Sequence, residues 1–358
     1  MVEADCSRLK SGVIEGFFGT PWSWADRESC AEFLRRRGFQ YYIYAPKSDP
    51  FLRKAWREPM PPNLEESLAR LSRRCGENGV SFGVGLTPFE LYRDYGDEAR
   101  RDLHNKVRQI DRIGTDLLCI LFDDMRGDVA GLAGLQAQII ADIASWTRAS
   151  NLIFCPTYYS FDPVLERVFG PKPQQYLEDL SRLVDPRIDF FWTGERVCSD
   201  GYSAQHLLEV QSIIGRKPFI WDNNITNDSK LRSRFLFMTP DSGKWNLPAG
   251  LAAGLAINPM NQPSLSLLAL CAYARVLGLP GEDVLSDNDC FADCGPALRA
   301  QLLSDLDAFQ KTGLDGIGET ARRSMLERYA AFESNPYARD TVAWLRGDYT
   351  FDPACLTA

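Results

Sequence analysis

The sequence predicts an α/β protein: a (β/α)8 TIM barrel followed by a C-terminal helical extension. Eight short apolar runs recur between residues 12 and 259, with starts 29 to 40 residues apart, and helix-period stretches separate most of them. Eight alternating strands and helices, with strands apolar throughout, indicate a parallel sheet that closes into a barrel. A doubly wound sheet, the rival architecture, would not need eight units, and no G-x-G-x-x-G follows the first run.

The runs that we expect to form strands are short and mainly apolar. In chain order they are GVIEGFFG from Gly12, YYIYAPK from Tyr41, SFGVGLTP from Ser81, DLLCILFDD from Asp116, NLIFCPTYY from Asn151, IDFFWTG from Ile188, KPFIWDNN from Lys217 and GLAINP from Gly254. A short apolar run between helix-period stretches fits a strand that is buried on both faces.

Helical periodicity fills most of the connections. The first helix-period stretch, SWADRESCAEFLRRRG, begins with Ser23 as its expected N-cap. The stretches NLEESLARLSRRCGENG and DEARRDLHNKVRQIDRIG end on glycine, as helices often do. The connection after the seventh run, ITNDSKLRSRFLFMTPDSGKW, is the least regular, and we expect at most a short helix there.

The pattern changes near Leu277, after which only helix-period stretches follow, among them CGPALRAQLLSDLDAFQKTG and GETARRSMLERYAAF. We therefore expect residues 1–280 to form the barrel that carries the site. We expect residues 281–358 to form the helical extension.

Composition and charge narrow the class of protein. The chain has 358 residues, 45% hydrophobic and 25% charged, which is ordinary for a globular protein, and its net charge is −8. An acidic balance argues against nucleic-acid and anionic-membrane partners, because it supplies no general attraction for phosphates. No segment approaches the apolar length of a membrane span, and the start lacks the pattern of a signal peptide. The oligomeric state stays open.

Cysteine usage indicates the compartment. The ten cysteines are scattered without a C-x-x-C pair, as free thiols in a reducing environment would be. Glycosylation sequons at Asn224 and Asn227 fall in the segment that we assign to the site, where a glycan would block it. We therefore expect a cytoplasmic protein, bacterial or from another unglycosylated setting.

Polar residues gather where the runs end, and the fourth run ends in two adjacent carboxylates, Asp123 and Asp124. The other run ends carry Glu15, Gly16, Lys47, Thr157, Tyr159, Thr193, Gly194, Trp221, Asp222, Asn223, Asp228 and Asn258. Active sites of these barrels lie at the carboxyl ends of the strands. Neighbours in a regular strand point to opposite faces, so Asp123 and Asp124 can act together only if the strand ends and the chain bends there.

The residue types at these ends suit a neutral ligand rich in hydroxyl groups. The two histidines, His104 and His206, lie inside helix patterns, and the sequence contains neither a Walker loop nor a nucleophile elbow. What remains is carboxylates, amides, tyrosines and tryptophans. Carboxylates and amides bind hydroxyls, and aromatic faces stack on sugar rings, so this set indicates glycoside hydrolysis.

Adjacent aspartates do not fit the usual pairs of catalytic carboxylates, which lie on opposite sides of the scissile bond. They fit substrate-assisted cleavage, in which the 2-acetamido oxygen of the sugar attacks the anomeric carbon. One carboxylate then holds the acetamido N–H, and its neighbour protonates the leaving oxygen. Repulsion between two close carboxylates raises the pKa of one of them and keeps it protonated as the acid.

An ordered set of motifs resembles glycoside hydrolase family 84. The motifs are GVIEGFFGTPWSW, YYIYAPKSDP…WREP, FDDM, CPTYY, WDNNITND and INP, and they span about residues 11 to 262. The family comprises the β-N-acetylglucosaminidases that remove O-linked GlcNAc from serine and threonine, and bacterial hyaluronidase-like homologues. The resemblance implies a glycoside or glycoprotein that bears β-GlcNAc as the substrate, and it implies no cofactor or metal.

The resemblance also implies roles for individual residues. Asp123 would orient the acetamido group, Asp124 would be the general acid/base, and Tyr159 would contact the acetamido oxygen. The remaining substrate-binding residues would be Gly16, Lys47, Thr193, Val197, Trp221, Asn223, Asp228 and Asn258. Ser48, Met125 and Tyr158 depart from the residues common in the family, but none of them replaces a catalytic group.

We thus expect a retaining exo-β-N-acetylglucosaminidase that forms an oxazoline intermediate. An endo-acting hydrolase of hyaluronan or chitin, with the same chemistry and an open groove, is the nearest alternative. A metal-dependent lyase or aldolase on the same barrel is another, with Mg²⁺ held by Asp123, Asp124 and a third carboxylate such as Glu15. A sugar-binding module without turnover is the last, and the intact aspartate pair argues against it.

Overall fold

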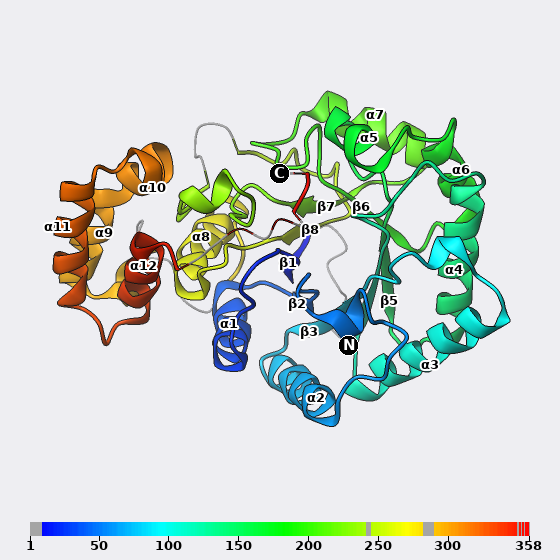
Figure 1. Ribbon diagram of the computed structural model, residues 1–358, viewed down its shortest axis with the longest axis horizontal. Coiled ribbons are helices and arrows are strands. Elements are labelled where there is room, and N and C mark those ends of the chain that lie inside the picture. The colour runs from blue at the N-terminus through cyan, green and yellow to red at the C-terminus, as the bar shows by residue number, and fades with distance from the viewer. Residues whose placement is uncertain are drawn as a thin grey trace.

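The computed structural model describes residues 9–240, 245–281, 290–348, 351, 353 and 355–357. Its strands form one closed parallel barrel in chain order, which confirms the predicted fold class (Figure 1). The strands are β1 (Lys10–Glu15), β2 (Tyr41–Tyr44), β3 (Ser81–Leu86), β4 (Leu117–Leu121), β5 (Asn151–Cys155), β6 (Asp189–Trp192), β7 (Phe219–Asp222) and β8 (Gly254–Ile257). Pairing of β1 with both β2 and β8 closes the barrel.

Helices follow the strands and surround them (Figure 1). Around the barrel lie α1 (Trp24–Arg37), α2 (Pro62–Glu77), α3 (Asp97–Ile113), α4 (Leu132–Trp146), α5 (Pro163–Phe169), α6 (Tyr176–Leu183), α7 (Ala204–Ile214) and α8 (Pro263–Val276). Beyond α8 lie α9 (Pro296–Asp307), α10 (Gly313–Gly316), α11 (Glu319–Ala330) and α12 (Pro336–Arg346). In the described part of the irregular connection after β7, the one helical element is a 3₁₀ turn, η3 (Arg232–Arg234), in agreement with the expectation of at most a short helix.

The start of α1 shows why the chain folds this way locally. Ser23 accepts a hydrogen bond from the backbone N–H of Asp26, and the carboxylate of Asp26 accepts one from the N–H of Ser23, which is a capping box. Arg27 of α1 forms a buried, two-pronged ion pair with Glu15 at the end of β1 (2.7 and 2.8 Å). Tyr42 of β2 also donates to Glu15. These contacts fix α1 against the first two strands.

The helices after residue 290 are tied to the barrel by buried polar contacts. Asp340 of α12 accepts hydrogen bonds from the first N–H groups of α8, those of Ser264 (2.7 Å) and Leu265 (3.3 Å). Trp344 of α12 donates to the carbonyl of Ser233 in the connection after β7.

The division into a barrel of residues 1–280 and an extension of residues 281–358 stays a prediction. Among the described residues, no helix is long and apolar enough to cross a bilayer.

Candidate active site

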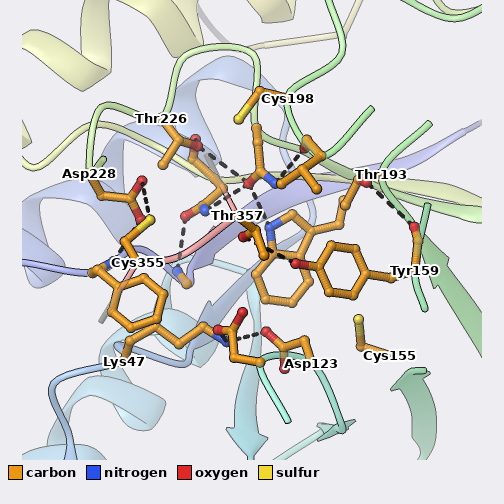
Figure 2. Close-up of a pocket in the computed structure, with 17 residues that line it drawn as sticks. Lys47, Asp123, Cys155, Tyr159, Thr193, Cys198, Thr226, Asp228, Cys355 and Thr357 are labelled. Carbon is orange, nitrogen blue, oxygen red and sulfur yellow. Dashed lines mark hydrogen bonds and ion pairs between the residues drawn. The ribbon is translucent and has the colours of Figure 1, made fainter. Parts of the chain in front are cut away.

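A pocket opens at the carboxyl ends of the strands, and every site residue that the sequence predicts lines it (Figure 2). The predicted residues are Gly16, Lys47, Asp123, Asp124, Tyr159, Thr193, Val197, Trp221, Asn223, Asp228 and Asn258. They come from the ends of seven different strands or from the loops that follow them, so the barrel brings together residues up to 242 positions apart. The roles assigned to these residues stay predictions.

The two adjacent aspartates face one pocket because β4 ends before them. The strand stops at Leu121, and Phe122 is still tied to β5, its N–H donating to the carbonyl of Cys155 (2.9 Å). Asp124 then adopts a left-handed backbone conformation, with φ of +57°. That conformation is uncommon for a residue with a Cβ atom, and it breaks the strand alternation. The bend that the sequence requires at this point is therefore present.

Lys47 neutralises the aspartate pair. Its ammonium group contacts Asp123 directly and lies 3.4 Å from Oδ2 of Asp124, and all three side chains are almost wholly buried. Burial raises the pKa of Asp124, and the neighbouring Asp123 adds to this, although Lys47 opposes both. Desolvation works to lower the pKa of Lys47, but the two aspartates outweigh it and raise that pKa. Asp124 therefore stays protonated up to a higher pH than a solvent-exposed aspartate does.

One oxygen of the pair is left unsatisfied. Oδ1 of Asp123 is buried and finds no hydrogen-bond partner among the residues that the structure describes. A buried acceptor without a donor is costly, so such an atom in a pocket indicates a donor supplied by a ligand.

The side-chain amide of Asn223 organises the opposite wall. Its Oδ1 accepts hydrogen bonds from Trp221 Nε1 and Asn258 Nδ2, both 2.9 Å long, and its Nδ2 donates to the carbonyl of Val197. Asn258 in turn accepts from the N–H of Gly16 (3.1 Å). A Cβ atom on Gly16 would lie 2.4 Å from the Trp221 ring, so only glycine allows this close approach. The Trp221 ring is thus fixed by a hydrogen bond to Asn223 and by close packing against Gly16.

Asp228 lies across the pocket from Tyr159 (Figure 2). Its Oδ2 accepts a hydrogen bond from the N–H of Phe18 (2.8 Å). Burial raises the pKa of Asp228 to about 6, against the lowering effect of that hydrogen bond. The carboxylate is thus ionised at neutral pH and titrates just below it.

Two residues near the end of the chain also line the pocket. Thr357 lies near Tyr159, whose hydroxyl donates to Oγ1 of Thr357 over 3.4 Å, and Sγ of Cys355 lies 3.9 Å from Oδ1 of Asp228 (Figure 2). Both are close to the side chains predicted to hold the sugar.

Comparison with known proteins decides the family. A family model described as β-N-acetylglucosaminidase matches residues 11–282, which is most of the chain and all of the barrel strands except Lys10 of β1. The chain belongs to the β-N-acetylglucosaminidase family. This confirms the resemblance to glycoside hydrolase family 84.

Two curated proteins and one solved structure are also similar to this chain. The protein O-GlcNAcases of Mus musculus and Rattus norvegicus are each 27% identical to it over 296 residues, which is 79% of this chain. The chain spans about a third of the length of those curated relatives, 32%. A solved structure of a variant O-GlcNAc hydrolase from Thermobaculum terrenum matches with a TM-score of 0.73 and 24% identity. The matched region covers 96% of this chain and 82% of the Thermobaculum terrenum chain. At 24% identity, the match supports the fold alone.

The pocket offers little to a metal ion. Within the described ranges, no group of three or more His, Cys, Asp or Glu side chains is placed to hold one. Glu15, the third carboxylate that the lyase alternative needs, is bound to Arg27 and does not line the pocket. Lys47 fills the space beside Asp123 and Asp124 where a cation would sit.

Some lining residues of this family member have no role in the sequence prediction: Phe18, Cys155, Cys198, Thr226, Cys355 and Thr357. Phe18 and Cys155 lie inside the runs expected to form strands, and Cys198 and Thr226 lie within two positions of the predicted residues Val197 and Asp228. Cys355 and Thr357 follow no strand, and nothing in their local sequence points to the pocket.

Proposed function

We propose that the protein is a retaining exo-β-N-acetylglucosaminidase that hydrolyses O-GlcNAc-type β-glycosides with the substrate's own acetamido group as nucleophile. The observation that carries this proposal is the buried, unpartnered Oδ1 of Asp123 beside the proton-retaining Asp124. An acetamido N–H would supply the missing donor. Family membership supports the same chemistry. Location in the cytoplasm, a bacterial source and a glycoprotein as the natural substrate stay proposals.

In the proposed reaction, Asp123 and Asp124 take the two carboxylate roles. Asp123 accepts the acetamido N–H, and the acetamido oxygen attacks the anomeric carbon while Asp124 gives its proton to the departing glycosidic oxygen. The C–O bond to the aglycone breaks, and an oxazolinium ion forms, whose positive charge Asp123 stabilises. Asp124 then takes a proton from water, which attacks the anomeric carbon and reopens the ring. Two inversions at the anomeric carbon leave the β configuration unchanged.

Exo action, rather than endo action, is favoured by the buried polar side chains at the end of the pocket formed by Asp228 and Asn258. Asp228 and Asn258 are buried there and offer polar atoms to the non-reducing hydroxyls of a single sugar. An endo-acting hydrolase would instead continue its groove beyond this point. Because Asp228 Oδ2 is fixed by the N–H of Phe18, the carboxylate cannot swing away to admit a second sugar without losing that bond.

Turnover of aryl glycosides tests the proposed function. We expect hydrolysis of an aryl β-GlcNAc and no comparable hydrolysis of the β-glucoside, which lacks the acetamido nucleophile. The rate on the β-GalNAc analogue, which differs only in the orientation of the 4-hydroxyl, measures how selective the site is for that hydroxyl. Cleavage of hyaluronan or chitin oligomers at internal bonds, without release of single sugars, would replace the exo proposal with the endo one.

The pH dependence of kcat/KM should follow the two titrating aspartates. As the pH falls through about 6, Asp228 gains a proton and loses its charge for binding sugar hydroxyls, so kcat/KM should fall. As the pH rises through the raised pKa of Asp124, the acid is lost and kcat/KM should fall again. Asp228→Asn should remove or shift the acidic limb, and an unchanged limb in that variant would show that another group produces it.

Chelation separates the hydrolase from the metal-dependent lyase. Activity on an aryl β-GlcNAc should persist in EDTA, because an ammonium group rather than a cation site faces the aspartates. The measurement compares rates before dialysis against EDTA, after it, and after addition of Mg²⁺ or Zn²⁺. Loss on chelation with recovery by either ion would favour the lyase.

A further inference from the structure

A closed ring of buried hydrogen bonds lies behind the aspartate turn and outside the pocket lining. Tyr176 donates from its hydroxyl to Oε1 of Gln136 (2.5 Å), and Nε2 of Gln136 donates to Oγ1 of Thr157 (2.9 Å). The Thr157 hydroxyl donates to the carbonyl of Phe122 (2.9 Å), and the N–H of Thr157 donates to the Tyr176 hydroxyl (3.0 Å). All three side chains are at most 2% exposed.

The ring joins the two chain segments that carry the chemistry. Phe122 immediately precedes Asp123, and Thr157 is two residues before Tyr159. Gln136 of α4 and Tyr176, the first residue of α6, hold the Thr157 hydroxyl in one orientation because each of their polar atoms is already engaged. A hydroxyl with a fixed donor and a fixed acceptor cannot rotate away from the Phe122 carbonyl.

We propose that Thr157, oriented by Gln136 and Tyr176, is a positioning residue that sets the left-handed turn of Asp123 and Asp124 against Tyr159. The turn needs such support because the backbone of Asp124 is in an unfavourable conformation that its surroundings must impose. This inference rests on the proposed function, since it assigns to Thr157 the alignment of the acid with the leaving oxygen.

The test compares Thr157→Val with Thr157→Ser on aryl β-GlcNAc substrates of increasing leaving-group pKa. Thr157→Val removes the hydroxyl and should lower kcat/KM for the poorest leaving group by roughly ten- to a hundredfold, since a misplacement of about 1 Å can cost that much. The loss should fall mainly on kcat and shrink for activated leaving groups, and Thr157→Ser should restore most of the rate. Tyr176→Phe removes the phenolic hydroxyl from the hydrogen-bond ring and should also lower kcat/KM for poor leaving groups. This variant replaces Thr157→Val in the test if Thr157→Val does not fold.

A matched control separates positioning from stability. Thr341 of α12 is equally buried, its hydroxyl donates to the carbonyl of Tyr337 (2.8 Å), and it does not line the pocket. Thr341→Val should lower Tm and leave kcat/KM unchanged. Equal losses across all leaving groups, an unaffected Thr157→Val, or a Thr157→Ser as slow as Thr157→Val would overturn the proposal. Turnover by the parent chain tests the proposed function separately.

A different observation, the position of residues 355–357 at the pocket, carries a second inference. Cys355 and Thr357 point into the pocket, and Leu356 between them is 61% exposed, as in an extended segment. With these residues in place the free cavity has a volume of about 50 Å³. That space holds a few waters at roughly 10–15 Å³ each and is too small for a sugar ring with its acetamido group.

We infer that residues 355–357 are an intramolecular inhibitor that must leave before the sugar binds. Thr357 is hydrogen-bonded to Tyr159 and Cys355 is near Asp228, so the segment occupies both ends of the predicted sugar site. The inference rests on the proposed function, because it concerns access to that same site. A pocket that is open a tenth of the time would show an apparent KM about tenfold above its intrinsic value.

Truncation and charge test this inference. A chain ending at Asp348 keeps α12 and its Gly347 cap, and it should show a several-fold lower KM with kcat unchanged. A synthetic peptide of residues 349–358 should then inhibit it competitively. In the full-length chain, Cys355→Asp places a carboxylate beside Asp228 and should lower KM by expelling the segment. Leu356→Asp, whose side chain points outward, is the matched control and should leave KM as it is.

Two results would overturn the inference. One is a KM that is the same in the parent, the truncated chain and Cys355→Asp. The other is a truncated chain that the peptide does not inhibit. A parent chain that turns over aryl β-GlcNAc with either result keeps the proposed function and loses only the inhibitor.

Discussion

Asp124→Ala is expected to slow glycosides with poor leaving groups by roughly 10²–10⁴-fold, the usual contribution of general acid catalysis. Burial raises the pKa of Asp124, and the residue lies in a pocket lined by the other predicted groups. An activated aryl group departs without protonation, so its cleavage should suffer far less. The measurement is kcat/KM for Asp124→Ala across aryl β-GlcNAc substrates of increasing leaving-group pKa.

The control for this variant is Asp128→Ala. Asp128 lies four positions further along the chain, pairs with Arg126 at the surface and does not line the pocket. It should leave the dependence on leaving group unchanged. A loss of the same size for every leaving group in Asp124→Ala would remove Asp124 from the role of acid.

Asp123→Asn should lower kcat/KM by roughly 10²–10³-fold, comparable with the loss of one preorganised electrostatic contact to a developing charge. The variant keeps the shape of the side chain but removes the charge that stabilises the oxazolinium ion. It also leaves Lys47, which contacts Asp123 directly, paired with Asp124 alone. Unlike Asp124→Ala, it should affect activated and poor leaving groups alike, because the oxazolinium forms with both. A strong dependence on leaving group in Asp123→Asn would contradict this division of roles.

The barrel was predictable because its signals are local and repeated. Each strand is a short apolar run, and the first helix begins with a capping box that Ser23 and Asp26 complete. Asp123 and Asp124 could be predicted to share a pocket, since a parallel barrel brings every strand end to one mouth. The positions of the other predicted lining residues follow from the same rule.

The contacts within the site were not predictable from the sequence. The left-handed conformation of Asp124 depends on what surrounds the turn, and aspartate alone does not specify it. The contact of Lys47 with both aspartates depends on how β2 and β4 are placed in the barrel. Gln136 looks like any residue of an amphipathic helix until the fold brings Thr157 and Tyr176 to it. The residues near the chain end reach the pocket through tertiary structure alone.

The most direct test of the central claim, that the substrate's acetamido oxygen is the nucleophile, is a fluorine series. Replacing the acetyl hydrogens of an aryl β-GlcNAc with one, two and three fluorines withdraws electron density from that oxygen with little change in shape. We predict that kcat/KM falls steeply and progressively along the series, while the product keeps the β configuration. A flat series, or a covalent glycosyl adduct on Asp123 detected by mass spectrometry, would contradict the account and make Asp123 the nucleophile.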